Sequence, residues 1–237
     1  MSVIALVPVE CREDGAVPGV LSAVHGEPLL VHAVRGLLES GCPDLILVLV
    51  PAHARAACVA ALHDVKYAEP PARTRVRVIA GGTSRTDSVR LFLRSGDLAE
   101  DDVVLVHDPA RAFTPPGPVR EVVAAIRAGA PAAVPVEPVT DTIKVIDADG
   151  VVTGTRDRAG LRCVQSPRGF RAATLLAGDA PADPLAWLGG RTHTVDGHPH
   201  GMRVVTEFDV TVAAAFAADT EKSPERSPGR STVEGSP

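Results

Sequence analysis

The chain has 237 residues, of which 45% are hydrophobic and 3% are aromatic, and its formal net charge is -5 at pH 7. This length suits one large domain with a core rich in alanine and valine, and the acidic balance argues against a nucleic-acid partner. The four cysteines show no C-x-x-C spacing, which argues against a zinc site and favours reduced thiols.

The amino terminus begins with the apolar run MSVIALVPVE, which has no basic leader. This run is far shorter than the roughly 20 apolar residues that span a bilayer. We therefore expect a cytoplasmic protein without a membrane partner, in which residues 3–9 form the first strand.

Short apolar runs alternate with amphipathic stretches along most of the chain. Further strands are expected at 45–51, 76–81, 103–108 and 132–138, because these runs are nearly continuous and rich in β-branched residues. Helices are expected at 28–41, 52–65, 85–96 and 115–129, where apolar residues recur every three or four positions. The alternation predicts an α/β fold: a Rossmann-like, mostly parallel sheet with helices on both faces and ligands at the carboxyl ends of its strands.

A segment at about 139–158 breaks this alternation. Two β-rich runs in it flank DADG (147–150), a hairpin-turn signal, so we expect a β-arm that projects from the sheet. After the arm we expect a short helix near 171–178, a strand at 201–206 and a helix at 207–220. Residues 220–237 are rich in Ser, Pro, Gly and charge, which predicts a disordered tail after a single domain spanning 1–219.

The stretch GGTSRTDSVR, residues 81–90, contains groups that suit a nucleotide site. Gly81 and Gly82 end an expected strand and permit a close approach of a ligand to the backbone. Asp87 and Ser88 follow at the start of a helix. They would either cap that helix, as in an ordinary strand-to-helix turn, or exchange hydrogen bonds with a base.

The stretch VLVHDPARAFTPP, residues 104–116, places Asp108 where an expected strand leaves the sheet. A carboxylate at this place would either hold Mg²⁺ together with substrate phosphates or cap a helix. Arg111 lies three residues later, and a guanidinium can bind a phosphate through two hydrogen bonds. We interpret His107 as a packed neighbour of this site rather than as a base.

The arm carries further polar groups at both of its ends. PVTDTIK contains Asp141 and Thr142, and TRDRAGLRCVQSPRGF contains Arg158 and Ser166. Taken singly, the arginines of this region would be solvated surface charges.

Taken together and in this order, GGTSRTDSV, VLVHDPARAFTPP, PVTDTIK and DRAGLRCVQSPRGF resemble the signature segments of the 2-C-methyl-D-erythritol 4-phosphate cytidylyltransferase family of the non-mevalonate isoprenoid pathway. The resemblance extends over about residues 3 to 216. It implies a fold of the nucleotide-diphospho-sugar transferase type and the transfer of CMP from CTP to the sugar-alcohol phosphate, with Mg²⁺ and release of pyrophosphate. It also implies a homodimer in which the β-arm of one subunit reaches over the active site of the other.

The resemblance also implies roles for individual residues. Asp108 would hold the metal, and Arg158 would act in the site of the second subunit. Nucleotide binding would involve Pro8, Val9, Gly81, Gly82, Asp87 and Ser88. Binding of the substrate phosphate would involve Arg111, Asp141, Thr142 and Ser166, and the catalytic cations would be Arg12, Arg158 and Arg203.

The loop after the first strand departs from the family pattern P-A-A-G-x-G-x-R followed by P-K. Val9 and Glu10 stand at the two alanines, no G-x-G-x-R is present, and Gly19 stands at the lysine. Arg12 is the only arginine before residue 35, and acidic residues surround it. Like charges a few ångströms apart cost about 1 kcal/mol in water and about 4 kcal/mol at an effective dielectric constant of 20.

Two hypotheses about function follow. In the first, the chain is an active cytidylyltransferase in which Arg12 and Arg111 cover the triphosphate. In the second, it is a catalytically impaired homologue that binds a nucleotide or a sugar phosphate, or acts as a regulatory partner, because the glycine loop and its lysine are missing. A structural relic without a ligand fits less well, because the GGTSRTDSV and HDPAR stretches are intact.

Overall fold

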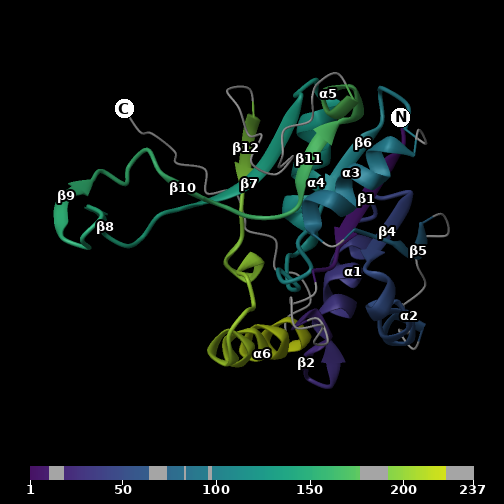
Figure 1. The fold of residues 1–237 in the computed structure, drawn as a ribbon, viewed down its shortest axis with the longest axis horizontal. Helices are drawn as coiled ribbons and strands as arrows, with labels where there is room; N and C mark the ends of the chain where they lie inside the picture. The colour runs from purple at the N-terminus through teal and green to yellow at the C-terminus, as the bar shows by residue number, and fades with distance from the viewer. Residues whose placement is uncertain (11–18, 64–73, 83, 96–97, 177–191, 223–237) are drawn as a thin grey trace, which may run out of the picture.

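In this computed structural model we describe residues 1–10, 19–63, 74–82, 84–95, 98–176 and 192–222. The five expected strands are present as β1 (Val3–Pro8), β4 (Leu45–Val50), β5 (Arg75–Ala80), β6 (Val103–Val106) and β7 (Ala132–Pro138). Together with β10 (Arg162–Val164), β11 (Arg168–Arg171) and β12 (Thr192–Asp196) they form one eight-stranded sheet. Figure 1 shows this sheet at the centre of the molecule.

The strand order is β10-β7-β11-β6-β1-β4-β5, and β12 pairs with β7. β1 runs parallel to both of its neighbours, with Ala5 opposite Ile46 of β4 and Leu105 of β6. β4 is parallel to β5, and β12 is parallel to β7. The mostly parallel sheet is therefore confirmed, although β10 and β11 run antiparallel to their neighbours.

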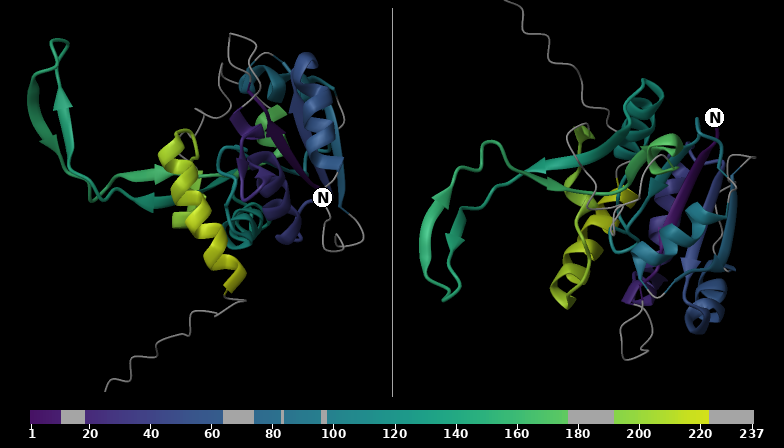
Figure 2. Two further views of the ribbon diagram at one scale, coloured as in Figure 1. Left: turned by 90° about the horizontal axis from the view of Figure 1, so that it is seen from below. Right: turned by 45° about the horizontal axis from the view of Figure 1, so that its top comes forward.

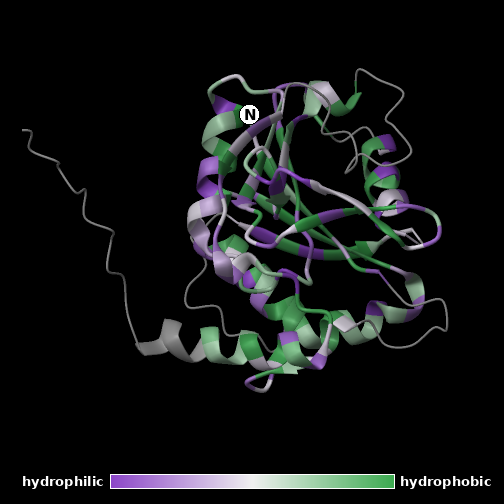
Figure 3. Cartoon of the chain, turned by 90° about the vertical axis from the view of Figure 1, so that its left-hand side faces the viewer, coloured by the Kyte–Doolittle hydropathy of each residue, from purple (hydrophilic) through white to green (hydrophobic). Residues whose placement is uncertain are grey.

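Helices cover both faces of the sheet, as expected. Because side chains alternate along a strand, Val3, Ala5 and Val7 of β1 face one layer of helices, and Ile4 and Leu6 face the other. The first layer contains α1 (Leu29–Glu39), α2 (Arg55–His63) and α4 (Pro116–Arg127); the second contains α3 (Arg85–Arg94) and α5 (Ala172–Leu176). In Figure 3 hydrophobic residues fill the strands between these helices.

The expected β-arm projects from the body of the molecule (Figure 2). Its hairpin consists of β8 (Ile143–Ile146) and β9 (Val152–Arg156), which pair only with each other. The DADG turn forms as predicted, because Asp147 Oδ1 accepts hydrogen bonds from the backbone N–H groups of Asp149 and Val151. Gly150 supplies the positive φ of 81° that the turn requires.

The carboxyl-terminal region differs from the expectation at one element. The prediction of a strand at 201–206 is wrong, because Pro199–Gly201 form a 3₁₀ turn and residues 202–205 are irregular. The strand lies earlier, at β12, and α6 (Glu207–Lys222) confirms the last helix. The tail expected after that helix, residues 223–237, lies outside the described residues.

α6 packs over a small cluster that contains Ala213 of the helix with Val24 and Leu29. Val24 belongs to the short pair β2 (Ala23–Val24) and β3 (Glu27–Pro28). Within the described part of the chain, no helix combines the length and the apolar composition that a membrane span requires.

Candidate active site

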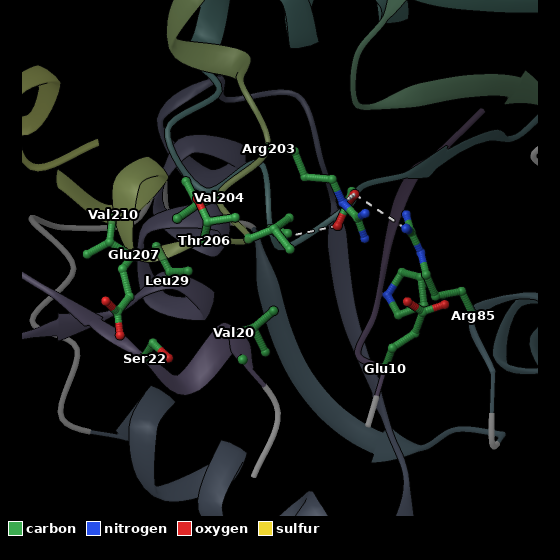
Figure 4. A pocket seen from close by; sticks show the side chains of 15 residues that line it. Glu10, Val20, Ser22, Leu29, Arg85, Arg203, Val204, Thr206, Glu207 and Val210 are labelled. Carbon is green, nitrogen blue, oxygen red and sulfur yellow. Dashed lines mark hydrogen bonds and ion pairs between the residues drawn. The ribbon is translucent and has the colours of Figure 1, made fainter. Parts of the chain in front are cut away.

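A cavity of about 370 Å³ opens at the carboxyl ends of β1 and β6. Figure 4 shows its lining side chains, which come from the end of β1, residues 20–22, the starts of α1, α3 and α6, the segment after β6 and the turn before α6. The charged lining residues are Arg85 and Arg203 together with Glu10, Asp108 and Glu207. The cavity therefore lies where ligands bind in open α/β sheets.

Asp108 lies at the centre of this charged group and is 8% exposed. Its Oδ2 accepts hydrogen bonds from Arg203 Nε at 2.9 Å and from Arg85 Nη1 at 3.3 Å, and the bond from Arg85 appears as a dashed line in Figure 4. Its Oδ1 accepts one from the backbone N–H of Ala110 at 3.0 Å. Its own N–H donates to Ser166 Oγ at 2.8 Å, so both the backbone and the carboxylate are fixed.

The charge of Asp108 follows from these contacts. Burial alone would raise the pKa of this carboxyl, because a low dielectric disfavours the charged form. The guanidinium groups of Arg85 and Arg203 outweigh burial and hold the pKa of Asp108 below its usual range. The cavity thus contains an ionised carboxylate between two cations at neutral pH.

His107 precedes Asp108 and is 1% exposed, which confirms its interpretation as a packed neighbour. Neither of its ring nitrogens has a hydrogen-bond partner among the described residues. Burial lowers the pKa of His107 to about 4, so the imidazole is neutral at neutral pH.

Arg111 does not line the cavity. Its guanidinium donates to the backbone carbonyl oxygens of Gly201 at 2.6 Å and Val164 at 3.0 Å. In this arrangement Arg111 joins the turn before α6 to the end of β10. Its expected contact with a substrate phosphate stays a prediction.

The GGTSRTDSVR stretch forms a capped turn into α3. Ser84 is the N-cap residue: its Oγ accepts from the Asp87 N–H at 3.1 Å and donates to Asp87 Oδ2 at 2.8 Å. Ser88 Oγ accepts from the Gly82 N–H at 3.0 Å and donates to the Ser84 carbonyl at 2.9 Å. The N–H of Gly81 donates to the carbonyl of Val50. The predicted strand-to-helix turn is confirmed, but the prediction of Asp87 and Ser88 as its caps is wrong, because the N-cap is Ser84. Contacts with a base stay a prediction.

The turn also explains why glycine occupies position 82. A Cβ atom built there would lie 2.5 Å from the Asp87 Cβ, so a side chain would push the strand end away from α3. The close packing of Gly82 on Asp87 therefore fixes the start of the helix that carries Arg85.

The predicted site residues of the arm lie apart from this cavity. Asp141, Thr142 and Arg158 are exposed, and none of them lines it. Arg158 Nη1 donates to the carbonyl of Thr140, which joins the two ends of the arm. Within one chain, the fold does not bring these residues to Asp108.

The loop after β1 starts and ends at the cavity. Pro8 and Glu10 line it on one side of the loop, and Gly19 lines it on the other. Val9 lies between them but is buried in the core, and its N–H donates to the carbonyl of Leu49. Arg12, the expected catalytic cation, lies outside the described residues.

Asp108 Oδ1 has an acceptor site that neither arginine occupies. Among the described residues no group of three or more His, Cys, Asp or Glu side chains could enclose a metal ion. Mg²⁺, however, is commonly held by one or two carboxylates with substrate phosphates as the other ligands. Both guanidinium groups bind Oδ2, which leaves Oδ1 with one lone pair beyond its bond from Ala110. The residues therefore fit a metal of this kind.

Sequence reasoning missed Arg85, which contributes one of the two cations at Asp108. The interpretation of GGTSRTDSVR considered glycines, caps and base contacts but not its first arginine. A usable signal was its position: Arg85 is the first residue of α3, directly after the turn that follows β5. Helix starts in this position point toward the carboxyl edge of a parallel sheet.

The family model of 2-C-methyl-D-erythritol 4-phosphate cytidylyltransferase matches residues 4–219. The chain is 46% identical over 231 residues to the 2-C-methyl-D-erythritol 4-phosphate cytidylyltransferase of Saccharopolyspora erythraea, covering 92% of this chain and 100% of that protein. It is 44% identical over 222 residues to the protein of the same name from Nocardia farcinica, covering 90% of this chain and 92% of that protein.

Solved structures agree with the sequence relatives. A 2-C-methyl-D-erythritol 4-phosphate cytidylyltransferase from Thermus thermophilus aligns with a TM-score of 0.65 at 28% identity, over 92% of this chain and 100% of that one. A 4-diphosphocytidyl-2C-methyl-D-erythritol synthase from Anaerococcus prevotii aligns with a TM-score of 0.72 at 19% identity, over 92% and 98% of the two chains, which supports the fold. The chain belongs to the 2-C-methyl-D-erythritol 4-phosphate cytidylyltransferase family.

Proposed function

We propose that this chain transfers CMP from CTP to 2-C-methyl-D-erythritol 4-phosphate and releases pyrophosphate. The observation that carries the proposal is the ionised Asp108 bound by Arg85 and Arg203 in a cavity at the carboxyl ends of β1 and β6. This arrangement offers two cations to a pair of anionic substrates. It lies in a chain whose relatives, by name, are cytidylyltransferases for the same phosphate.

The reaction places most of its demands on charge and alignment. A phosphate oxygen of the acceptor attacks the α-phosphorus of CTP, and the bond from that phosphorus to the bridging oxygen of the leaving pyrophosphate breaks. Negative charge grows on the leaving group, so cations fixed beforehand lower the barrier. We assign this work to Arg85 and Arg203, whose guanidinium groups meet at Asp108 Oδ2.

Asp108 has two roles in this proposal. Its carboxylate orients both arginines, and its Oδ1 would hold Mg²⁺ together with phosphate oxygens of CTP. When bound, the metal neutralises phosphate charge and orients the triphosphate. Ser166 keeps Asp108 in place through the bond that its Oγ accepts from the Asp108 backbone.

The remaining assignments complete the site. We propose that the turn from Gly81 to Ser88 binds the cytosine and ribose. We further propose a homodimer through the β-arm, which would carry Arg158, Asp141 and Thr142 to the substrate phosphate bound by the other subunit. The exposure of these three residues, and of Val145, Ile146, Val151 and Val152 beside them, supports an arm that contacts a second copy.

The proposal is tested by incubating the purified protein with CTP, Mg²⁺ and 2-C-methyl-D-erythritol 4-phosphate and measuring pyrophosphate release. ATP in place of CTP serves as the control for base selection. We expect release with CTP only. Binding of CTP in a calorimeter without any pyrophosphate release would contradict the proposal and favour a homologue that binds but does not react.

The loop residues at the cavity give a second test. Glu10→Gly combined with Gly19→Lys removes an anion and adds a cation at the cavity, and we expect CTP to bind about tenfold or more tightly. Among the described residues, no atom beyond the chain neighbours of Gly19 lies within 4 Å of a Cβ placed there, so a side chain meets none of them. Calorimetry with CTP measures the change. Gly117→Lys combined with Glu121→Gln makes the same change of charge on α4, away from the cavity, and should leave CTP affinity unchanged. Equal affinities in all three proteins would refute a phosphate contact by the loop.

A further inference from the structure

Gln165 is a buried polar residue between the arm and the cavity, and its exposed fraction is 4%. Its carboxamide makes three hydrogen bonds. Nε2 donates to Glu137 Oε2 at 2.7 Å and to the carbonyl of His198 at 2.8 Å, while Oε1 accepts from the N–H of His198 at 2.9 Å. Both amide hydrogens and one acceptor site are therefore used. Two of the three bonds join Gln165 to the backbone of His198.

His198 lies in the turn at residues 197–203, which leads to Arg203. Two glycines of this turn pack directly on Gln165: a Cβ at Gly197 would lie 2.7 Å from Gln165 Oε1, and one at Gly201 would lie 2.8 Å from it. The turn therefore lies against the carboxamide with no space for a side chain between them. A shift of Gln165 would have to move this backbone.

Two further contacts continue this support toward the cavity. The carbonyl of Gly201 accepts from Arg111, and the N–H of Val204 donates to the carbonyl of Ala110 at 2.8 Å. Arg203 lies between these two anchored residues. Its side chain then reaches Asp108, although 46% of that side chain is exposed to solvent, so the backbone supplies most of its placement.

The segment of Gln165 and Ser166 also fixes Asp108, the partner of Arg203 in the ion pair. Ser166, the next residue, accepts a hydrogen bond from the backbone of Asp108. Gln165 and Ser166 thus hold the backbones that carry Arg203 and Asp108, respectively. Both ends of the arm are attached here as well, since Glu137 lies in β7 before the arm and β10 ends at Val164 after it.

We propose that Gln165 is a positioning residue for the reaction, which rests on the proposed cytidylyltransferase function. Its carboxamide sets the 197–203 turn, and through that turn the place of the Arg203 guanidinium against Asp108. Its bond to Glu137 ties the same turn to the root of the arm. Gln165 therefore links the position of the arm to the position of a cation that acts on the phosphates.

The test compares Gln165→Leu with the wild-type protein in the pyrophosphate-release assay. Leucine has a similar size but makes none of the three bonds. We expect kcat to fall by about 10- to 100-fold, since displacements of about 1 Å in a catalytic group cost up to about 100-fold. The KM for CTP should change by less than about threefold, because the proposed base contacts at 81–88 are untouched. An unchanged kcat in the folded variant would overturn the inference.

A control separates positioning from general loss of stability. Ile126→Ala removes a buried side chain of α4 from the core, away from the cavity. It should lower the melting temperature without changing the turn at residues 197–203. We expect this variant to keep its kcat at temperatures where it is folded. The loss of kcat per degree of lost melting temperature can be compared between Ile126→Ala and Gln165→Leu. If the two values are equal, the role of Gln165 is only structural and the inference fails.

Hydrogen exchange gives a readout that does not need activity. In Gln165→Leu, backbone amides of residues 197–204 should exchange about tenfold faster than in the wild type, because the turn loses its anchoring bonds. Unchanged exchange in this segment would overturn the inference even if kcat falls. A wild-type protein that releases no pyrophosphate would instead refute the proposed function, so the two failures are distinguishable.

A reciprocal exchange tests the link to the arm. Gln165→Glu places two carboxylates where the 2.7 Å bond to Glu137 lies, so they repel each other. Adding Glu137→Gln restores a donor and an acceptor at this pair in the opposite sense, while the bond to the His198 carbonyl stays lost in both variants. We expect the double variant to have a kcat about tenfold above that of Gln165→Glu, while Glu137→Gln alone, which keeps an acceptor for Gln165, stays close to wild type. A double variant no faster than Gln165→Glu would refute the link.

Discussion

Pyrophosphate release is expected to fall by about 100- to 1,000-fold when Asp108 is replaced by asparagine. The amide has nearly the same shape, so the cavity keeps its size, but it has no charge. Arg85 and Arg203 lose the carboxylate that both of them bind, and the proposed metal loses a charged ligand. Steady-state assays of Asp108→Asn against the wild type measure the effect.

Asp102→Asn is the matched control on the same strand. Asp102 lies just before β6, at its amino end, where its carboxylate accepts from the N–H groups of Ser2 and Ala99. The same chemical change there should lower the melting temperature and leave kcat almost unchanged. Wild-type turnover in Asp108→Asn would show that the ion pairs at the cavity are structural and would remove the support for the proposed mechanism.

The second large effect is on stability against acid. The pKa of His107 falls to about 4 in the folded protein because of burial, against about 6.5 in an unfolded chain. Between these values the unfolded state binds a proton and the folded state does not, so acid favours unfolding. We expect this group to lower the free energy of unfolding by about 3 kcal/mol as the pH falls from about 6.5 to about 4.

Urea unfolding at several pH values measures this slope in the wild type and in His107→Leu. The variant has no group to protonate at this place, so its free energy of unfolding should depend less steeply on pH. His53→Leu makes the same replacement at an exposed position and serves as the control for the substitution itself. Asp108 does not alter this comparison, because a carboxyl with a lowered pKa keeps its stabilising contribution above about pH 3.8 and loses it only at lower pH. Equal slopes for wild type and His107→Leu would contradict the prediction.

Long apolar strands were predictable because burial on both faces leaves a continuous β-branched run, as in β4. β10 and β11 were not, since they have three and four residues and include arginines at their ends. In β11, Gly169 is required by packing rather than by a turn: a Cβ there would lie 2.4 Å from Val122 Cγ1 of α4. This packing requirement cannot be inferred from the sequence of β11 without knowing which helix lies against it.

The expected strand at 201–206 shows a different limit. Its valines have a high β-propensity, but propensity is weak where tertiary contacts compete. Here Gln165 and Arg111 bind the backbone of the preceding turn, and Pro199 lies within it. These bonds join residues between about 30 and 90 positions apart, and periodicity in a short window does not detect them.

The candidate site was only partly predictable, because it too depends on contacts between residues far apart in the sequence. Asp108 and Arg203 were found through the family pattern, and the fold brings them together. The guanidinium of Arg111 donates to carbonyl oxygens, and its expected contact with a phosphate stays a prediction. The residue type indicated a donor to oxygen atoms but not which oxygen atoms. Arg85 was missed because only the packing of α3 against the strand ends directs it to Asp108.

The arm has a stability that is separate from that of the body. Its two strands pair only with each other, and an isolated two-stranded hairpin is marginally stable in water. Most side chains of the hairpin are exposed, so little apolar burial opposes its opening. Its amides should therefore exchange through local opening, with a free energy well below that of global unfolding. In the proposed dimer, contact with the second subunit would therefore depend on a hairpin that opens without unfolding of the body.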